Sequence, residues 1–234
     1  MNTTKQVMKN YTSKLSHITS HRFAFLLPGF CLVAAAFAGN APVPPQSAAF
    51  GKTLAAWQDA YFRWWAGQWA IAPDGNGNAD VGNVVLMPVP NAPGDGTPGH
   101  LDVTLNSGQA FTLPLLFLLG TSYTDGTPND PLVDVSFFQT LNLTLQIDGQ
   151  TVVNNGNLMN YYSSFYFAPP IPIDSAPIAS VIWCEDLAIV HTPLPVGTHT
   201  IKLDLKSTQN LPPNFGGGPL EFHNTWTVIV QPAR

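Results

Sequence analysis

The sequence predicts a mostly β fold: an antiparallel β-sandwich, or a barrel-like relative of it, with one N-terminal, aromatic-rich amphipathic helix packed on it. Two patterns carry this prediction. Short segments after residue 83 alternate apolar and polar residues, and Pro- and Gly-rich turns separate them, which is typical of sandwiches and barrels. One earlier stretch, 53–69, repeats its apolar residues with the helical period instead. Because its broad aromatic face must cover something, we expect this helix to lie on the sheet.

The strands follow from the period of two. Segment 141–147 alternates strictly between apolar and polar residues, the mark of a half-buried strand. Asp148-Gly149 comes directly after it, and 150–153 resumes the pattern, so we expect a hairpin closed by a type I′ turn. Further strands, several of them less regular, are expected at 101–105, 110–119, 158–167, 179–191, 201–205 and 226–230.

The helical stretch separates into two faces when each residue is advanced by 100°. Asp59 and Arg63 fall on the outer face, four residues apart, where they can form an ion pair. Four of the six tryptophans of the chain lie in this one stretch. We expect its buried face to consist of Leu54, Trp57, Tyr61, Phe62, Trp64, Trp65 and Trp69.

Residues 1–38 are predicted to be a cleavable signal peptide. A basic segment without acidic residues precedes an apolar run, and an Ala-Phe-Ala sequence ending at residue 38 fits the small-x-small cleavage rule. A membrane anchor is the alternative, but a spanning helix needs about 20 apolar residues, and a Pro-Gly pair interrupts this shorter run. We therefore expect a Pro-rich tether at 39–46 and a single domain at 47–234. The protein would be secreted or periplasmic, without stable membrane insertion after cleavage.

Loss of the leader makes the protein strongly acidic. Four of the nine Lys and Arg residues lie in the leader and none of the fourteen Asp and Glu residues does, so five basic residues face fourteen acidic ones, a net charge of −9. Nucleic acids and anionic membrane surfaces both require clustered Lys and Arg. The composition therefore argues against both as partners. Cys184 is left as the one cysteine of the mature chain, and in its apolar stretch it is interpreted as a small buried hydrophobe.

The N-terminal helix also resembles that of a known group of proteins. Its sequence Gly51-Lys-Thr-Leu-Ala-Ala-Trp57, followed by Trp64-Trp65 and Trp69, is similar to the G-K-[ST]-x-x-x-W and W-W-x-x-x-W motifs that open an uncharacterised family of exported bacterial proteins. The segments 107–111, 146–149 and 197–201 are similar to that family as well. The resemblance implies export and a β-rich body, and it implies no reaction.

One loop has the pattern of a calcium site. Asp74, Asn76, Asn78 and Asp80 place oxygen side chains at positions 1, 3, 5 and 7, with glycines between them that let the loop curl. Ca²⁺ takes six to eight oxygen ligands of this kind. The alternative is an ordinary polar turn after a helix. The loop departs from the EF-hand pattern because Val85 stands where that pattern has a bidentate Glu.

Candidate acids and bases gather in one segment, which contains Glu185, Asp186 and His191. Adjacent residues of a strand face opposite sides, so Glu185 and Asp186 reach one site only across a bulge. We interpret the histidines as structural, because no close-spaced pair is present to begin a transition-metal site. The aromatic segment 161–167 either fills the interior or stacks on a ligand such as a sugar.

Three functions are compatible with these features. The first is a secreted module that binds a small molecule, a glycan, a surface or a partner, and that Ca²⁺ stabilises if the Asp74–Asp80 loop is a calcium site. The second is a Ca²⁺-assisted hydrolase of an ester, lactone or glycosidic bond, in which Asp186, Glu185 or His191 acts as general base. The third is a structural envelope protein. No nucleophile elbow, dinucleotide fingerprint or P-loop occurs in the sequence, so the binding module ranks first, closely followed by the hydrolase.

Overall fold

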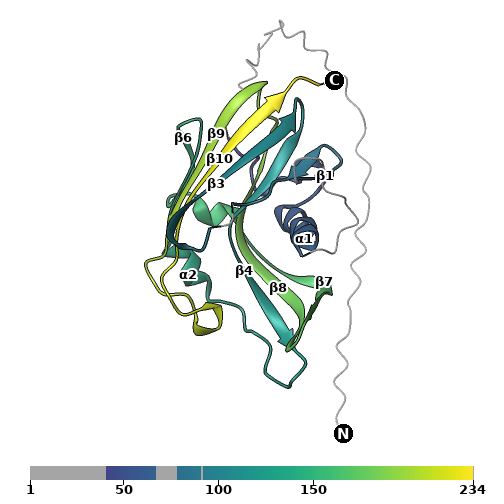
Figure 1. Cartoon of the computed structure of the whole chain (residues 1–234), viewed down its shortest axis with the longest axis vertical. Helices are drawn as coiled ribbons and strands as arrows, with labels where there is room; N and C mark the ends of the chain where they lie inside the picture. The colour runs from purple at the N-terminus through teal and green to yellow at the C-terminus, as the bar shows by residue number, and fades with distance from the viewer. Residues whose placement is uncertain (1–40, 67–77, 91, 234) are drawn as a thin grey trace, which may run out of the picture. The chain divides into compact units, whose positions relative to one another are not determined.

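The computed structural model describes residues 41–66, 78–90 and 92–233. In these residues ten strands form two sheets that pack on each other, which confirms the β-sandwich (Figure 1). The first sheet has the strand order β1-β2-β4-β8-β7, and the second has the order β3-β10-β9-β5-β6. The strands are β1 Ala79–Val81, β2 Val84–Leu86, β3 Asp95–Asn106, β4 Ala110–Tyr123, β5 Asn142–Ile147, β6 Gln150–Asn154, β7 Tyr162–Ser175, β8 Ile178–His191, β9 Gly197–Lys206 and β10 Glu221–Gln231.

Most neighbouring strands are antiparallel, but two pairs are parallel. β10 runs parallel to β3, and β2 runs parallel to β4. The short helical elements are η1 Ala49–Gly51, α2 Val135–Gln139, η2 Leu158–Tyr161 and η3 Pro213–Phe215. The predicted hairpin is confirmed: β5 and β6 are joined at Asp148 (φ 50°) and Gly149 (φ 77°), the two positive φ values that a type I′ turn requires.

Helix α1, Leu54–Trp65, lies on the outer face of the first sheet, against β4, β7 and β8 (Figure 1). It starts at Thr53, whose hydroxyl accepts a hydrogen bond from the Ala56 amide and so satisfies one of the free N–H groups of the first turn. The predicted Asp59–Arg63 ion pair forms, with the two side chains 3.0 Å apart.

The buried face of α1 differs from the prediction at two positions. Gln58 is buried, because it donates a hydrogen bond to Thr112 on the sheet. Trp65 is 49% exposed, because this last residue of the helix packs mainly against the edges of the Phe62 and Phe117 rings and keeps its remaining surface in solvent. Trp69, predicted on the same face, lies outside the described residues.

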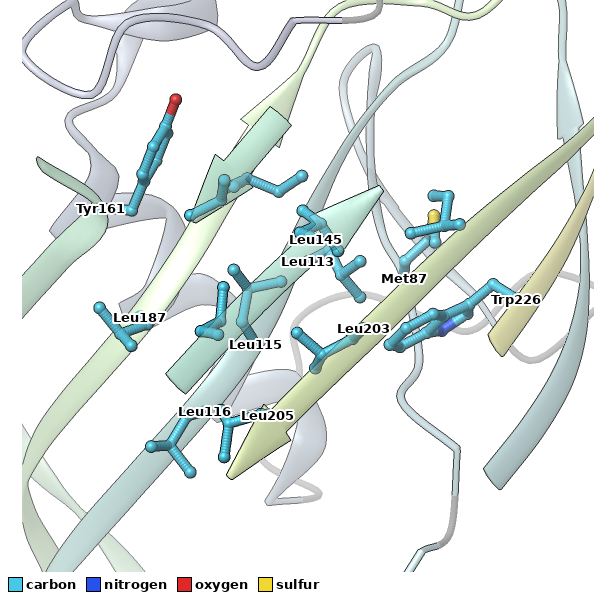
Figure 2. Close-up of a cluster of buried hydrophobic side chains, with 14 of the residues drawn as sticks. Met87, Leu113, Leu115, Leu116, Leu145, Tyr161, Leu187, Leu203, Leu205 and Trp226 are labelled. Carbon is cyan, nitrogen blue, oxygen red and sulfur yellow. The ribbon is translucent and has the colours of Figure 1, made fainter. Parts of the chain in front are cut away.

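The space between the sheets is filled by apolar side chains. Figure 2 shows Leu113, Leu115 and Leu116 of β4 among Leu203, Leu205 and Trp226 of the second sheet, all of them buried. The Trp226 indole N–H, buried with its ring, donates to the Pro88 carbonyl at 2.9 Å. Burial of aromatic and branched side chains on this scale is the main stabilising contribution to such a fold.

The two sheets differ in what covers their outer faces. β8 is buried at every residue from Trp183 to His191, because one face points into the space between the sheets and the other lies under α1. β9 alternates between buried and exposed residues from Ile201 to Lys206, because its outer face is open to solvent. The central strand β8 of the first sheet is thus covered on both faces, whereas the second sheet offers a free face of polar side chains.

The segment predicted to be a tether is partly fixed to the sheet. Pro42 forms a bridge with His191, and the Val43 amide donates to the Val190 carbonyl at 2.8 Å. These contacts occupy the side of β8 that β7 leaves open beyond Leu187. In the part of the chain that the structure describes, no helix has both the length and the hydropathy needed to cross a membrane.

Candidate functional site

The predicted catalytic residues lie in β8 but do not share a site. Glu185 points into the space between the sheets, on the same face as Trp183 and Leu187. Its two carboxylate oxygens accept hydrogen bonds from the Val133 amide and the Tyr162 hydroxyl, each at 2.7 Å. Glu185 thus ties the strand to a loop and to β7, and its carboxylate is buried.

Asp186 faces the opposite way, toward α1, and none of its surface is exposed. It forms a hydrogen bond with the hydroxyl of Ser163 on β7. Burial raises the pKa of the Asp186 carboxyl from 3.8 to about 8, and the Ser163 bond opposes the rise only in part. The carboxyl is therefore neutral in the folded protein at pH 7.

His191 ends the same strand and is also buried. Its Nδ1 lies 2.7 Å from the Thr192 carbonyl oxygen, and its ring stacks on Phe111 with the centroids 5.0 Å apart. Cys184 lies on the Asp186 face, and burial raises the pKa of its thiol, which agrees with the interpretation of a small buried hydrophobe. The structure therefore does not bring Glu185, Asp186 and His191 together around a reachable space.

Half of the predicted calcium loop lies outside the described residues, namely Asp74 and Asn76. Of the other two residues, Asn78 donates from Nδ2 to the Thr104 carbonyl at 3.1 Å, and Asp80 accepts from the Gln109 amide at 3.2 Å. Among the residues that the structure describes, no three His, Cys, Asp or Glu side chains are grouped so that they could hold a metal ion. Calcium binding at Asp74, Asn76, Asn78 and Asp80 stays a prediction.

The aromatic segment 161–167 divides between the interior and the surface. Tyr161 and Phe167 are buried, and Phe165 packs beside Phe167 under α1. Tyr166 is exposed. Most of these rings therefore fill the interior, and they form no continuous platform for a ligand.

The open face of the second sheet contains a polar groove of about 490 Å³. It crosses β5, β9 and β10 and reaches the β6 end of the hairpin. Its walls combine amide, hydroxyl, carboxylate, ammonium and imidazole groups. The polar residues that line it are Asn142, Thr144, Asn154, Asn155, Asp204, Lys206, Glu221 and His223.

Strand register explains why these side chains meet. Asn142 pairs with Lys206, and Lys206 pairs with Glu221, so the three form one row across the sheet. Residues two positions apart in a strand lie on the same face. A second row on the same outward face therefore lies two residues away on each strand. It consists of Asn154, Thr144, Asp204 and His223.

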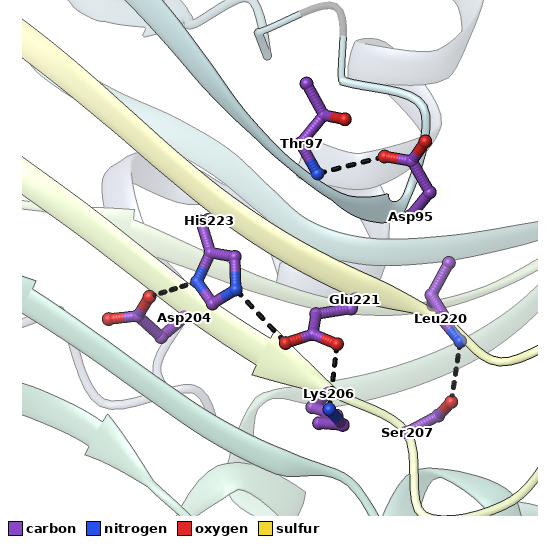
Figure 3. A network of polar contacts seen from close by, with 8 residues as sticks. All are labelled: Asp95, Thr97, Asp204, Lys206, Ser207, Leu220, Glu221 and His223. Atoms are coloured by element: carbon purple, nitrogen blue, oxygen red, sulfur yellow. Dashed lines mark hydrogen bonds and ion pairs between the residues drawn. The ribbon is translucent and has the colours of Figure 1, made fainter.

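Ionic hydrogen bonds join the two rows at the β9–β10 side of the groove (Figure 3). His223 lies between two carboxylates, with Nδ1 2.7 Å from Asp204 and Nε2 3.2 Å from Glu221. Lys206 donates to the other Glu221 oxygen at 2.8 Å. Hydrogen bonds with Asp204 and Glu221 raise the pKa of His223, and hydrogen bonds from Lys206 and His223 lower the pKa of the Glu221 carboxyl.

Amides hold the other side of the groove. Asn155 accepts from the Leu143 amide at 2.8 Å and donates to the Asn142 side chain at 3.0 Å. The Asn154 side chain accepts from the Gly156 amide at 2.8 Å, which shapes the turn after β6. The groove therefore has hydrogen-bonding groups whose positions are set by a rigid sheet and by a well-bonded turn.

Sequence reasoning did not find this groove. The signal that existed was the pairing of polar residues two apart in three segments: Asn142 with Thr144, Asp204 with Lys206, and Glu221 with His223. Such pairs are expected on any open sheet face. The sequence does not give the register that aligns these three segments, and the interpretation of His223 as structural therefore took no account of its neighbours Asp204 and Glu221.

Comparisons with known proteins add little. No protein-family model matches the sequence, and no curated protein matches it either. Among solved structures, the chain is similar to the CooA pilin subunit from enterotoxigenic Escherichia coli, with 12% identity, 58% of this chain and 92% of that chain covered, and a TM-score of 0.18. A TM-score this low carries no argument about fold or function.

Proposed function

We propose that this protein is an exported β-sandwich binding module, and that its polar groove takes a hydroxyl-rich ligand such as a glycan. The observation that carries the proposal is the groove itself, which is lined by eight polar side chains, seven of them in two aligned rows on β5, β6, β9 and β10 and the eighth in the turn after β6. Glycan hydroxyls both donate and accept hydrogen bonds, and this lining supplies both kinds of partner.

The chemical groups that line the groove limit the class of ligand that it could bind. Lys206 and His223 are balanced by Asp204 and Glu221, so the groove has no excess of positive charge that would select an anion. Among the described residues that line it there is no Phe, Tyr or Trp ring on which a sugar could stack. Recognition would therefore depend on hydrogen bonds to the hydroxyl groups of a neutral or weakly charged saccharide.

Binding is favoured over hydrolysis by the burial of the candidate catalytic groups. A general base must come within hydrogen-bond reach of its substrate. Glu185 and Asp186 point to opposite faces of a covered sheet, and His191 is buried beside Phe111. A hydrolase would need a different set of residues, and its product would be a cleaved ligand, whereas a binding module releases the ligand unchanged.

Binding can be tested by presenting the protein to a broad array of neutral oligosaccharides and measuring the affinity of any saccharide it retains. We expect Lys206→Ala to weaken binding about tenfold, because one charged hydrogen bond contributes about 1.5 kcal/mol. Lys202→Ala is the matched control, since Lys202 is exposed on the same strand but does not line the groove. Absence of saturable binding across the array, or equal losses in the two variants, would contradict the proposal.

Export is proposed from the leader-like first 38 residues, and it has a separate test. The full chain with a C-terminal tag, produced in a secreting bacterium, should yield a mature protein that begins at Gly39. Intact-mass measurement of the purified protein checks this. A tagged protein that accumulates with residues 1–38 attached would contradict export by a cleavable leader.

A further inference from the structure

A second hollow lies at the edge of β4, where the space between the two sheets opens toward Trp65 of α1, on the side of the second sheet opposite the polar groove. This inter-sheet cleft has a volume of about 440 Å³ and is walled by Leu116 of β4, Phe222 of β10, and Leu211 and Leu220 of the β9–β10 connection. Its size falls in the range of small-molecule sites, which are mostly apolar with few polar groups. Among the described residues that line it, none carries a charge.

The cleft is located where β4 has an unpaired edge. β2 pairs with β4 only at Ala110, Phe111 and Thr112. Beyond these residues, no described strand pairs with β4 on that side. The sheet therefore leaves the interior accessible beside Pro114 and Leu116, and the cleft lies there.

One lining residue breaks the apolar pattern of the interior. Asn224 lies on the inward face of β10, between Phe222 and Trp226, and is only 7% exposed. Its Oδ1 is buried and accepts no hydrogen bond from the described residues. Gly99 of β3 lies opposite Asn224 in the parallel strand pair. A Cβ atom added to Gly99 would lie 2.5 Å from this oxygen. A buried amide group without a partner costs about 1–3 kcal/mol, so an interior strand position would ordinarily hold an apolar residue.

We propose that the inter-sheet cleft binds a small neutral molecule with an apolar body and one hydrogen-bonding head group, such as a hydroxyl, and that the Asn224 amide bonds the head group. The apolar body would replace water against the leucine walls. A charged head group is disfavoured, because none of the described side chains that line the cleft carries a charge that could neutralise it. This site is distinct from the polar groove, since His223 and Asn224 are consecutive strand residues and face opposite sides.

The test uses N-phenyl-1-naphthylamine, a neutral apolar fluorophore with one N–H donor, and the complete mature chain. We expect a saturable rise in fluorescence at one site, reversed by 1-decanol and not by decanoate at pH 7. Asn224→Leu should fold normally, since leucine suits its surroundings, and should weaken binding of the probe five- to tenfold. Ala92→Phe, which adds a large ring to a residue that lines the cleft, should abolish binding.

The control is Asn160→Leu, which makes the same exchange at an exposed position away from the cleft and should leave the affinity unchanged. Circular dichroism of each variant establishes that it is folded. The proposal fails if the probe shows no saturable binding, if a folded Ala92→Phe or Asn224→Leu binds it as tightly as the parent protein, or if decanoate competes as well as decanol. None of these results depends on whether the polar groove binds a saccharide.

Discussion

Gly120→Ala is expected to destabilise the protein by about 3–5 kcal/mol, more than an alanine at an open glycine position could. Gly120 pairs with Trp183 across β4 and β8, and the indole ring lies directly over the glycine. An added Cβ would overlap the ring of Trp183. The ring cannot move freely, because it is buried and its N–H donates to the Asp130 carbonyl at 2.8 Å. Urea unfolding of the purified variant measures the effect.

A control and a rescue make this prediction specific. Gly218→Ala should cost less than about 0.5 kcal/mol, because a Cβ there meets nothing within 4 Å. In a Trp183→Leu background the smaller side chain leaves room for the methyl group, so Gly120→Ala should cost much less than in the parent protein. An equal cost in both backgrounds would show that the overlap with Trp183 is not the cause.

Asp186→Asn is expected to stabilise the protein by about 2 kcal/mol at pH 7 and to remove part of its pH dependence, because a gain of about 4 kcal/mol from the proton is partly offset by a buried amide N–H₂ at the position of Oδ2, which has no partner among the described residues. The pKa of Asp186 is about 8 in the folded protein, compared with 3.8 for an aspartate side chain exposed to water, as in the unfolded chain. Between about pH 4 and pH 8 the Asp186 carboxyl is therefore protonated in the folded protein and ionised in the unfolded chain. For a carboxyl whose pKa is raised by folding, stability falls as the pH rises from about 4 to 8. Each pH unit in this window costs about 1.4 kcal/mol.

The measurement is urea unfolding of parent and variant at pH 5, 6, 7 and 8. We expect the difference in stability between them to grow with pH, because asparagine has the shape of the neutral carboxyl and no proton to lose. Asp125→Asn is the matched control, since Asp125 is exposed and hydrogen bonds with Thr127 lower its pKa, so it is ionised in the folded and the unfolded protein throughout this range and the difference should not grow with pH. His199 and His223 also have raised pKa values, but they are present in every variant, so their contribution cancels. Parallel stability curves for parent and Asp186→Asn would refute the assigned burial.

The sequence predicted those elements whose pattern is complete within one segment. The β5–β6 hairpin follows from strict alternation around Asp148-Gly149, and α1 follows from its aromatic face. Strands covered on one face were found where the alternation is regular, as at 201–205, but β9 itself begins four residues earlier, at Gly197. β8, buried on both faces, lacks the alternation that identifies a strand, but Pro and Gly residues at its two ends still gave the bounds 179–191, one residue short of Ile178–His191. β1 and β2 are too short to show any period.

The candidate sites depended on how α1 and the two sheets pack on one another, which no single segment of the sequence shows. The opposite orientation of Glu185 and Asp186 was predictable, because neighbours in a strand face opposite sides. Their burial was not, since it results from α1 on one face and the second sheet on the other. The same holds for Trp65, whose exposure depends on where the helix ends relative to Phe117.

By itself, the sequence determined the fold class, the helix, the main hairpin and the acidic character of the chain, because periodicity, turn residues and charge are local properties. Only the tertiary structure decided which strands became neighbours, including the two parallel pairs, and which sheet face stayed open. The polar groove and the inter-sheet cleft both belong to this second class. Each gathers side chains from distant segments, and their meeting is determined by strand register and sheet packing, which act between segments that no local pattern connects.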